Sequence, residues 1–402
     1  MADVLSLLMC REVISMDSPS RPRVLPALGD PALFSSQWPA TPYRSAGRAK
    51  SLDALLTWAN IDRLLNDQAI QAPAFRMVRD NQLISPELLC RPEGSTSLGL
   101  SGLMDPARVL SALGSGATLV LQGLNRFWPP LGDLCRRLSS EIGHPIFANA
   151  YLTPSAARGF GAHRDPYHAW LIQCEGSKSW RLWAPDADHA ADPPTLDVTL
   201  RKGDVLWIPR GWWHSGASVD APSLHVTLTV WATKTEDVLR AMLASLSGRP
   251  EMTRELPPNA LAEDGSATAE VTRAVTEIIQ LISALETSEL AGRIIGARRQ
   301  RFDPLPAPPV AEVLGERQRK NFHVHPEGII YWAVDPTGAI ISTADALVAV
   351  PPEYVASCEK LLTGTGPTIP RDELADFGQD LLDKLIEARL LCTASHEATP
   401  TP

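Results

Sequence analysis

Three side chains in the middle of the chain have the types and spacing of a metal site. His163 and Asp165, here called the His-x-Asp pair, are separated by one residue, and His214 follows much later. In an extended chain alternate residues point the same way, so the pair would present an imidazole and a carboxylate together. Two imidazoles and one carboxylate on one face of a metal form the arrangement that non-haem Fe(II) oxygenases use. The open positions would receive a co-substrate and O2.

Apolar and aromatic runs around these residues predict the strands that would position them. Tyr167–Gln173 and Trp180–Trp183 are bounded by Gly, Ser or Pro and are expected to be two strands, with a hairpin turn at Gly176-Ser177. Val205–Pro209 predicts a further strand, closed by a turn. Antiparallel return after that turn would bring His214 beside the His-x-Asp pair.

The residues that precede His214 distinguish a metal site from a chance pattern. By itself the His-x-Asp pair is equally explained as a hydrogen-bonded loop pair, since both residue types are mostly exposed or paired. Gly203-Asp204, however, precedes a strand that ends in Pro-Arg-Gly and is followed by two tryptophans and His214. This run resembles the last turn and iron-ligand strand of the cupin-like, JmjC-related oxygenases.

Longer segments extend the resemblance, in chain order, to the ribosomal oxygenases, the JmjC proteins that hydroxylate side chains of ribosomal proteins. These segments are Phe147–Pro154, Gly159–Asp165, Gln173–Arg181 and Gly203–His214. The resemblance implies that the His-x-Asp pair and His214 hold Fe(II), and that Lys178 pairs with the distal carboxylate of 2-oxoglutarate. Asn149 and Tyr151 would line the co-substrate pocket from the neighbouring strand.

The role implied for Lys178 has a physical reason. A dicarboxylate in a protein interior needs a compensating cation, and a lysine reaching inward from a strand supplies one as a compact charge. The alternatives are a surface lysine at this position, a turn or edge residue at Asn149 and a core aromatic at Tyr151.

The run Ser223–Val230 alternates polar and apolar residues, so one face of a strand here would face the pocket. Thr227 or His225 on that face would contact 2-oxoglutarate. A purely structural strand explains the same pattern.

The sequence departs from the resembled family at several points. Arg164 separates the two ligands of the His-x-Asp pair, and His168 follows, which adds a cation and an imidazole to the site. His168 either touches substrate or faces outward from its strand. The polar segment Pro185–Thr199 is short, and we expect a loop near the pocket mouth. These departures concern the substrate more than the metal.

Length and charge exclude several classes of protein. The 402 residues are enough for about two or three domains and a sizeable core. With 37 basic and 46 acidic residues the formal charge is −9, which argues against a general affinity for nucleic acid. An acidic surface would favour a basic partner, and ribosomal proteins are basic.

The cysteines and the apolar runs indicate a cytoplasmic protein. None of the six cysteines has a close pair or a Cys/His spacing typical of zinc, so reduced thiols are expected. The apolar start, Met1–Cys10, lacks a basic region and is cut short by Arg11-Glu12. No run reaches the ~20 apolar residues that a membrane helix requires.

On this resemblance we expect a mainly β, double-stranded β-helix of the JmjC or cupin type, with helical and α+β additions. Residues 1–30 would form a loose N-terminal segment and residues 31–235 the oxygenase domain. Residues 236–303 carry helical apolar stripes and, as in the resembled family, would form a dimerisation region, with a helical spacer as the alternative. Residues 304–402 resemble the family's winged-helix domain. Its helical region is acidic, so direct DNA binding is not expected.

Hydrophobic periodicity predicts further elements. Strands are expected at 75–78, 118–121, 322–325, 329–333 and 339–341, and helices at 61–65, 106–113, 133–142, 238–246, 271–285, 353–362 and 371–391. His323 and His325 share a face of one predicted strand, but without a third ligand they are expected to be structural.

The resemblance implies a hydroxylase of a protein side chain, expected to belong to a ribosomal protein, that uses Fe(II), 2-oxoglutarate and O2. A peptide natural product or a free amino acid would suit the same barrel. A metal-binding cupin scaffold without catalysis is a third reading, which the complete iron and co-substrate constellation disfavours. Demethylation of methyl-lysine is disfavoured because no aromatic cage is evident.

Overall fold

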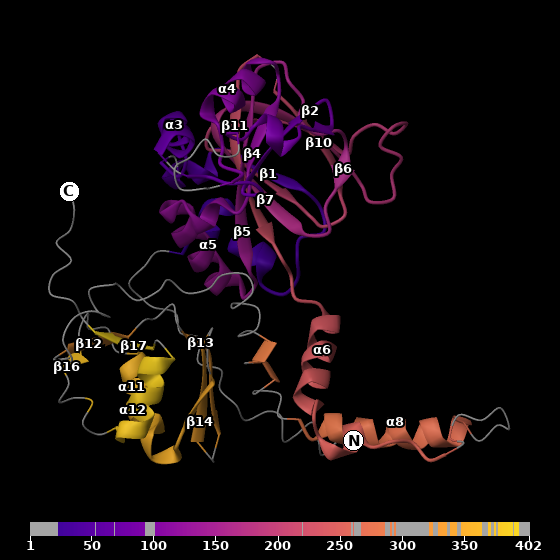
Figure 1. Cartoon of the computed structure of the whole chain (residues 1–402), viewed down its shortest axis with the longest axis vertical. Coiled ribbons are helices and arrows are strands. Elements are labelled where there is room, and N and C mark those ends of the chain that lie inside the picture. The colour runs from indigo at the N-terminus through magenta and orange to yellow at the C-terminus, as the bar shows by residue number, and fades with distance from the viewer. Residues whose placement is uncertain are drawn as a thin grey trace. The chain divides into compact units, whose positions relative to one another are not determined.

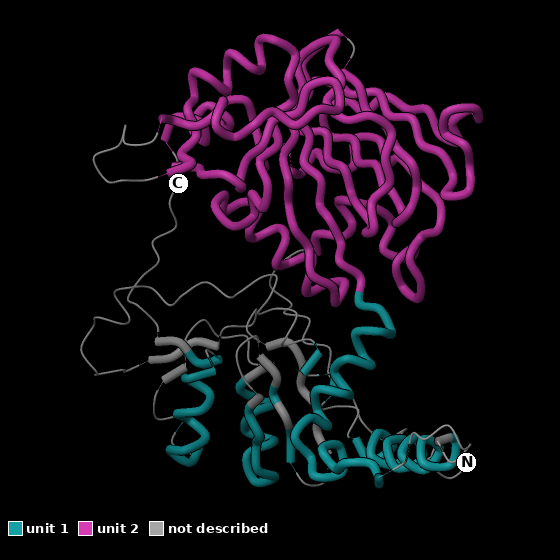
Figure 2. The backbone as a smooth tube through the Cα atoms, turned by 45° about the vertical axis from the view of Figure 1, so that its right-hand side comes forward, with its two compact units in different colours: residues 1–22, 233–402 teal, residues 23–232 magenta. Residues whose placement is uncertain are grey.

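The computed structural model (Figure 1) divides the chain into two compact units, which are coloured separately in Figure 2. One unit is Arg23–Ala232, and the other contains the described residues from Thr233 onward. The structure describes residues 23–294 and 321–393, apart from 53, 68, 93–100, 219, 259, 261–266, 286–289, 292, 325–328, 336–337, 344–346, 364–368, 371–373, 375–376 and 389.

The unit Arg23–Ala232 is built on an antiparallel sheet with the strand order β1-β9-β7-β11-β5-β4-β2-β3. Strands β8 and β10 pair with the second half of β7, and β6 pairs with β10. This arrangement confirms a β-sandwich core of the JmjC or cupin type. The strands are Tyr43–Ser45 (β1), Phe75–Arg79 (β2), Gln82–Leu83 (β3), Thr118–Leu121 (β4), Ile146–Thr153 (β5), His163–Arg164 (β6), His168–Trp183 (β7), Leu196–Arg201 (β8), Val205–Ile208 (β9), Trp213–Ala217 (β10) and Ser223–Val230 (β11).

Helices cover one face of this sheet. The apolar stripes of α3 and α5 pack with Trp170 and Val226 of the sheet in one core cluster. Asp105 begins α4 by accepting hydrogen bonds from two backbone N–H groups, and Gly143, with φ +70°, ends α5. The helices expected at 61–65, 106–113 and 133–142 are confirmed in longer form. They are α2 (Leu25–Leu28), α3 (Trp58–Asp67), α4 (Pro106–Gly114) and α5 (Pro129–Ile142), with short 3-10 turns at Pro31–Phe34, Arg48–Leu52, Pro86–Leu88 and Leu124–Arg126.

The other face of the sheet is where polar residues are buried. Along β11, Val226 and Leu228 join the helix-covered core, while His225 and Thr227 alternate with them and line a cavity. All eight residues of β11 are buried, because β5 and β7 flank this strand. The sheet thus offers an enclosed polar strip on which a site can be built.

The hairpin predicted at Gly176-Ser177 is wrong, because β7 runs without reversal from His168 to Trp183. Its first half pairs with β9 and β11, and its second half pairs with β8 and β10. Gly176, at φ +65°, allows this change of partner, and a Cβ there would lie 1.8 Å from the carbonyl oxygen of Pro222. The glycine marks a close backbone approach within a strand, not a turn.

Two other expectations need correction in this unit. The polar loop predicted to extend to Thr199 ends earlier, because Leu196–Arg201 forms β8 against β7. The alternating Leu196, Val198 and Leu200 pack in the smaller apolar cluster, which explains the strand. At the N-terminal side, Leu25 and Leu28 are buried in the core although they lie in the segment expected to be loose.

The second unit contains helices followed by two small sheets. Its helices are α6 (Thr235–Leu246), α7 (Pro250–Thr253), α8 (Ala267–Ser283), α11 (Val355–Thr363) and α12 (Gln379–Glu387). Its sheets have the orders β16-β12-β17 and β13-β14-β15, with β12 Asn321–Val324, β13 Ile329–Asp335, β14 Gly338–Thr343, β15 Leu347–Val350, β16 Ile369–Pro370 and β17 Leu391–Thr393.

The helix predicted at 371–391 is too long, because among the described residues of this range the α-helix spans Gln379–Glu387, and Leu391 begins a strand. Strand β15 was not expected. Along the part of the chain that the structure describes, no helix is long and apolar enough to cross a membrane.

Candidate metal and co-substrate site

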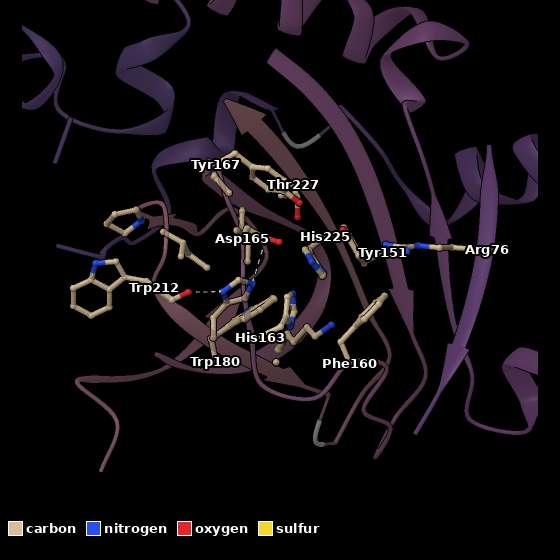
Figure 3. Close-up of a pocket in the computed structure, with 17 residues that line it drawn as sticks. Arg76, Tyr151, Phe160, His163, Asp165, Tyr167, Trp180, Trp212, His225 and Thr227 are labelled. Carbon is tan, nitrogen blue, oxygen red and sulfur yellow. Dashed lines mark hydrogen bonds and ion pairs between the residues drawn. The ribbon is translucent and has the colours of Figure 1, made fainter. Parts of the chain in front are cut away.

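The structure brings the three predicted metal ligands together. Strand β10 pairs with β6 so that His214 lies directly opposite His163. The imidazole Nε2 of His214 is 3.5 Å from a carboxylate oxygen of Asp165, and one ligand atom from each of the three residues lies within 4.8 Å of the others. Figure 3 shows the His-x-Asp pair on the wall of the same cavity. The predicted antiparallel return is confirmed.

Backbone carbonyls fix the tautomer of both imidazoles. Nδ1 of His163 donates to the carbonyl oxygen of Gly161 at 3.0 Å, and Nδ1 of His214 donates to that of Trp212 at 3.1 Å. Each ring therefore keeps the lone pair of Nε2 free, which is the form that binds metals. Burial lowers the pKa of His214 to about 4, and the neighbouring His163 adds to this shift. His214 is neutral at physiological pH.

This donor set fits a divalent transition metal. Adjacent ligands about 2.1 Å from one ion lie roughly 3 Å apart, close to the separation of His214 from Asp165. Three ligands on one side leave the opposite positions for other molecules. Among the described residues, these three form the one group of His, Cys, Asp or Glu placed to hold a metal.

Lys178 lies in the same cavity as a buried cation. It is 5% exposed, and its Nζ donates to the hydroxyl of Thr153 at 3.1 Å. No described carboxylate pairs with it, and burial lowers its pKa to about 7. Its Nζ also lies 5.2 Å from the centroid of the Trp180 ring. A buried ammonium that lines a cavity and has no carboxylate partner is suited to bind an anion.

Tyr151, Thr227 and His225 also line this cavity. The rings of Tyr151 and His225 are stacked, with centroids 4.8 Å apart and planes 6° apart. Burial, reinforced by Lys178, lowers the pKa of His225 well below its usual value, so its ring is neutral. Its Nδ1 has no hydrogen-bond partner among the described residues.

The remaining predicted residues lie outside the cavity lining. Asn149 accepts a hydrogen bond from the N–H of Gly123 at 2.9 Å, and a second side-chain hydrogen bond joins it to Tyr151, which lines the cavity. His168 accepts a hydrogen bond from the N–H of Arg210, and its ring lies against the rings of both Trp38 and Trp207.

The departures from the family pattern face away from the metal. The guanidinium of Arg164 lies 5.2 Å from the centroid of the Trp213 ring, and this pair is in register across β6 and β10. Trp212, but not Trp213, lines the cavity, so only the first of the two tryptophans helps to form its wall.

His325 lies outside the described residues, and His323 is on β12.

Sequence reasoning missed four residues of the cavity or its supports: Arg76, Thr153, Phe160 and Tyr167. The available signal for Arg76 was a cation placed between the apolar residues Phe75 and Met77. Thr153 continues the alternation that begins with Asn149 and Tyr151 on β5, so its side chain shares their face.

A double-stranded β-helix with a cluster of two histidines and one aspartate defines the class of cupin-like metal proteins. Residues 126–238 match the model of the JmjC domain. The chain is 31% identical over 147 residues to the bifunctional lysine-specific demethylase and histidyl-hydroxylase NO66 of Drosophila persimilis, covering 34% of this chain and 21% of that protein. It is 31% identical over 186 residues to ribosomal oxygenase 1 of Gallus gallus, covering 41% of this chain and 31% of that protein.

Solved structures agree with this placement in fold. The crystal structure of Escherichia coli ribosomal oxygenase YcfD has a TM-score of 0.56 at 16% identity, and the match covers 91% of this chain and 98% of that one. A structure of YcfD with cobalt and 2-oxoglutarate has a TM-score of 0.57 at 16% identity, covering 90% and 97%. Residues 126–238 are thus similar to a JmjC domain, and the proteins that the chain resembles include ribosomal oxygenases. The chain spans about a fifth of the length of the NO66 proteins that it matches.

Proposed function

We propose that this protein is an Fe(II)- and 2-oxoglutarate-dependent oxygenase that hydroxylates a protein side chain. The observation that carries the proposal is the presence, in one cavity, of an open three-ligand metal site and a buried cation without a carboxylate partner. A protein that only bound a metal would need the three ligands alone. The buried cation provides in addition for an anion that reaches the metal.

His163, Asp165 and His214 would hold Fe(II) through two Nε2 atoms and a carboxylate oxygen. When bound, Fe(II), 2-oxoglutarate and O2 supply the oxidation, in which 2-oxoglutarate becomes succinate and CO2 and the substrate gains a hydroxyl group. The protein positions the reactants and excludes water. Leu171, Ile208 and Trp212 supply apolar wall for this purpose.

Lys178 would bind the distal carboxylate of 2-oxoglutarate. Thr153 orients its ammonium, and Thr118 in turn donates to Thr153 at 3.2 Å, so the charge is held by a short chain of hydroxyls. Thr227 and Tyr151 line the cavity beside it and would offer hydroxyls to the co-substrate. Asn149 would support this arrangement by orienting Tyr151.

For the substrate we propose a side chain of a ribosomal protein. The relatives named as ribosomal oxygenase and as histidyl-hydroxylase support a protein substrate. The formal charge of −9 favours a basic partner of this kind. A free amino acid would need no such complementarity over the surface.

We further propose that α6 and α8 form a dimer contact within residues 236–303. Val271, Val275 and Ile279 follow one another on one side of α8 and are 45%, 47% and 57% exposed. Leu239 and Leu243 of α6 are 51% and 45% exposed. Apolar stripes of this extent are normally covered by a partner, and a second copy of the chain would bring the same stripe.

For residues 304–402 we propose a winged-helix domain that contacts protein. The described helices and small sheets of this region share a core that includes Ile341, Leu381 and Leu385. A cytoplasmic setting is supported by the four cysteines whose side chains the structure describes, because none of them is in a disulfide bond: Cys90, Cys135, Cys174 and Cys358.

The proposed function is tested by reconstitution without O2. Protein with Fe(II) and 2-oxoglutarate should show a metal-to-2-oxoglutarate absorption band and should form succinate when O2 is admitted. The variant His163→Ala should do neither, whereas Lys178→Ala should recover part of its activity at high 2-oxoglutarate. Metal-loaded wild-type protein with neither band nor succinate would contradict the proposal and favour a scaffold.

A further inference from the structure

A second cation, Arg76, stands in the wall of the same cavity. On β2 the flanking Phe75 and Met77 are buried in the helix-covered core, and Arg76 between them points to the opposite face and lines the cavity. Arg76 precedes the residues that match the JmjC domain, 126–238, so that match assigns it no role.

The register of the sheet directs Arg76 toward Tyr151. Arg76 pairs with Val120, Val120 with Tyr151, and Tyr151 with His225, so the four residues form one row across β2, β4, β5 and β11. Residues directly opposite one another share a face, and Figure 3 shows the Arg76 side chain reaching toward Tyr151. The row ends at the imidazole of His225, on which the Tyr151 ring is stacked.

The guanidinium of Arg76 is only partly satisfied inside the protein. It hydrogen-bonds to the hydroxyl of Tyr151, but its Nε is buried without a partner, and none of the ion pairs among the described residues includes it. Its Cζ lies 5.4 Å from the centroid of the Phe160 ring. A guanidinium has five N–H donors and no acceptor, and a donor buried without an acceptor is costly. An acceptor entering the cavity would remove that cost.

Arg76 and Lys178 serve different parts of the cavity. Lys178 contacts Thr153, near the end of β5. Arg76 instead lies against the Phe160 ring and hydrogen-bonds to the hydroxyl of Tyr151. The guanidinium therefore lies on the side of the cavity that Tyr151 and Phe160 form, and the Phe160 ring has its centroid 5.8 Å from that of the predicted metal ligand His163.

We propose that Arg76 determines the class of side chain that the pocket accepts, namely a neutral or anionic group that accepts a hydrogen bond, such as an imidazole, carboxamide or carboxylate. The inference rests on the proposed function and makes its substrate more specific. A guanidinium cannot lose its proton, so an arginine or lysine of the substrate would meet a fixed like charge. The same repulsion disfavours a methylated lysine.

The test measures peptide selection separately from co-substrate binding. Protein loaded with Mn(II) and 2-oxoglutarate without O2 is titrated with fluorescent peptides that differ only at the central residue, which is His, Asn, Asp, Arg or Lys. The same peptides are then exposed to the Fe(II)-loaded protein and O2, and the mass gain of one oxygen is measured. We expect peptides centred on His, Asn or Asp to bind at least about tenfold more tightly than those centred on Arg or Lys.

Two variants make the result specific to Arg76. Arg76→Glu should reverse the order of the peptides, and Arg76→Gln, which keeps a polar side chain without charge, should bring them to within a few-fold of one another. Circular dichroism and Mn(II) affinity check that each variant is folded.

Four outcomes would overturn the inference. The first is that the wild type binds Arg or Lys peptides more tightly than the others, and the second is that both variants keep the wild-type order of peptide affinities. The third is that Arg76→Gln loses 2-oxoglutarate binding but keeps that order, which would assign Arg76 to the co-substrate. The fourth is that the wild type binds 2-oxoglutarate but none of the peptides. Failure of the wild type to bind 2-oxoglutarate at all would refute the proposed function, and the inference with it.

Discussion

The binding of 2-oxoglutarate should depend on pH in a way that Lys178 alone sets. The ammonium is 5% exposed, has one hydroxyl partner, and has a pKa of about 7 because burial disfavours its charge. If only the charged form binds a dicarboxylate, the protonated fraction falls from about one half at pH 7 to about one hundredth at pH 9. The Kd should therefore rise about fiftyfold over this range. The carboxylates of 2-oxoglutarate stay ionised, and His214 stays neutral.

Calorimetry on Mn(II)-loaded protein without O2 measures both the Kd and the protons taken up on binding. Titration at pH 8 in buffers of different ionisation enthalpy should show an uptake of about 0.9 proton, since Lys178 is mostly neutral before binding and charged after it. The matched control is Lys178→Arg, which shares the metal site but keeps its charge throughout. Its Kd should be nearly constant from pH 7 to 9. A wild-type Kd that is also constant, or an equal slope in the two proteins, would refute the assignment of the slope to Lys178.

Three further variants test the surroundings of the site and the dimer contact. Gly216→Ala would place a Cβ 2.9 Å from Cε of Lys178. The Kd of 2-oxoglutarate, measured by calorimetry, should rise about tenfold while the metal affinity is kept. The control Gly114→Ala, whose Cβ would meet no atom within 4 Å, should change neither quantity. Lys178→Met should raise the free energy of unfolding at pH 7 by about 1–4 kcal/mol, measured by denaturant titration. The pKa of Lys178 is about 7 in the folded protein and 10.5 ordinarily, so the wild type should become more stable as the pH rises between these values. The stability gained by Lys178→Met should therefore shrink over this range, and a constant difference between the two proteins would contradict this. In sedimentation velocity, Ile279→Glu should shift the mass from dimer to monomer, whereas the control Gln280→Glu, at an exposed position, should not. An unchanged mass in Ile279→Glu would contradict the proposed dimer contact.

The metal site could be predicted from sequence because its determinants are local. One-residue spacing on a strand places His163 and Asp165 on one side, and a turn after β9 returns His214 to them. Lys178 was identified only through the family resemblance, since nothing local distinguishes a buried lysine from a surface one. Its burial depends on the change of partner strands along β7 at Gly176, where the sequence pattern predicted a turn.

Arg76 shows what sequence reasoning could not reach. Its place in the cavity depends on the pairing of β2 with β4 and of β4 with β5, contacts between segments far apart in the chain. Asn149 shows the converse, because its strand and face are as expected but its side-chain oxygen accepts a hydrogen bond from the N–H of Gly123. Alternation predicts the face of a strand on which a residue lies, and only the neighbouring strands decide what it meets there.

The two cations of the cavity respond differently to pH, and this separates co-substrate binding from substrate selection. Lys178 can lose its proton, so the empty cavity avoids a buried charge above pH 7, and the charge returns when an anion binds. Arg76 cannot lose its proton, and its charge is stabilised by the Tyr151 hydroxyl, by the face of the Phe160 ring and by any acceptor that enters the cavity. Raising the pH from 7 to 9 should therefore reduce the affinity for 2-oxoglutarate but leave the order of Asn, Asp and Arg peptides unchanged at saturating 2-oxoglutarate. A change of that order over this range would show that a titrating group, and not Arg76, selects the substrate.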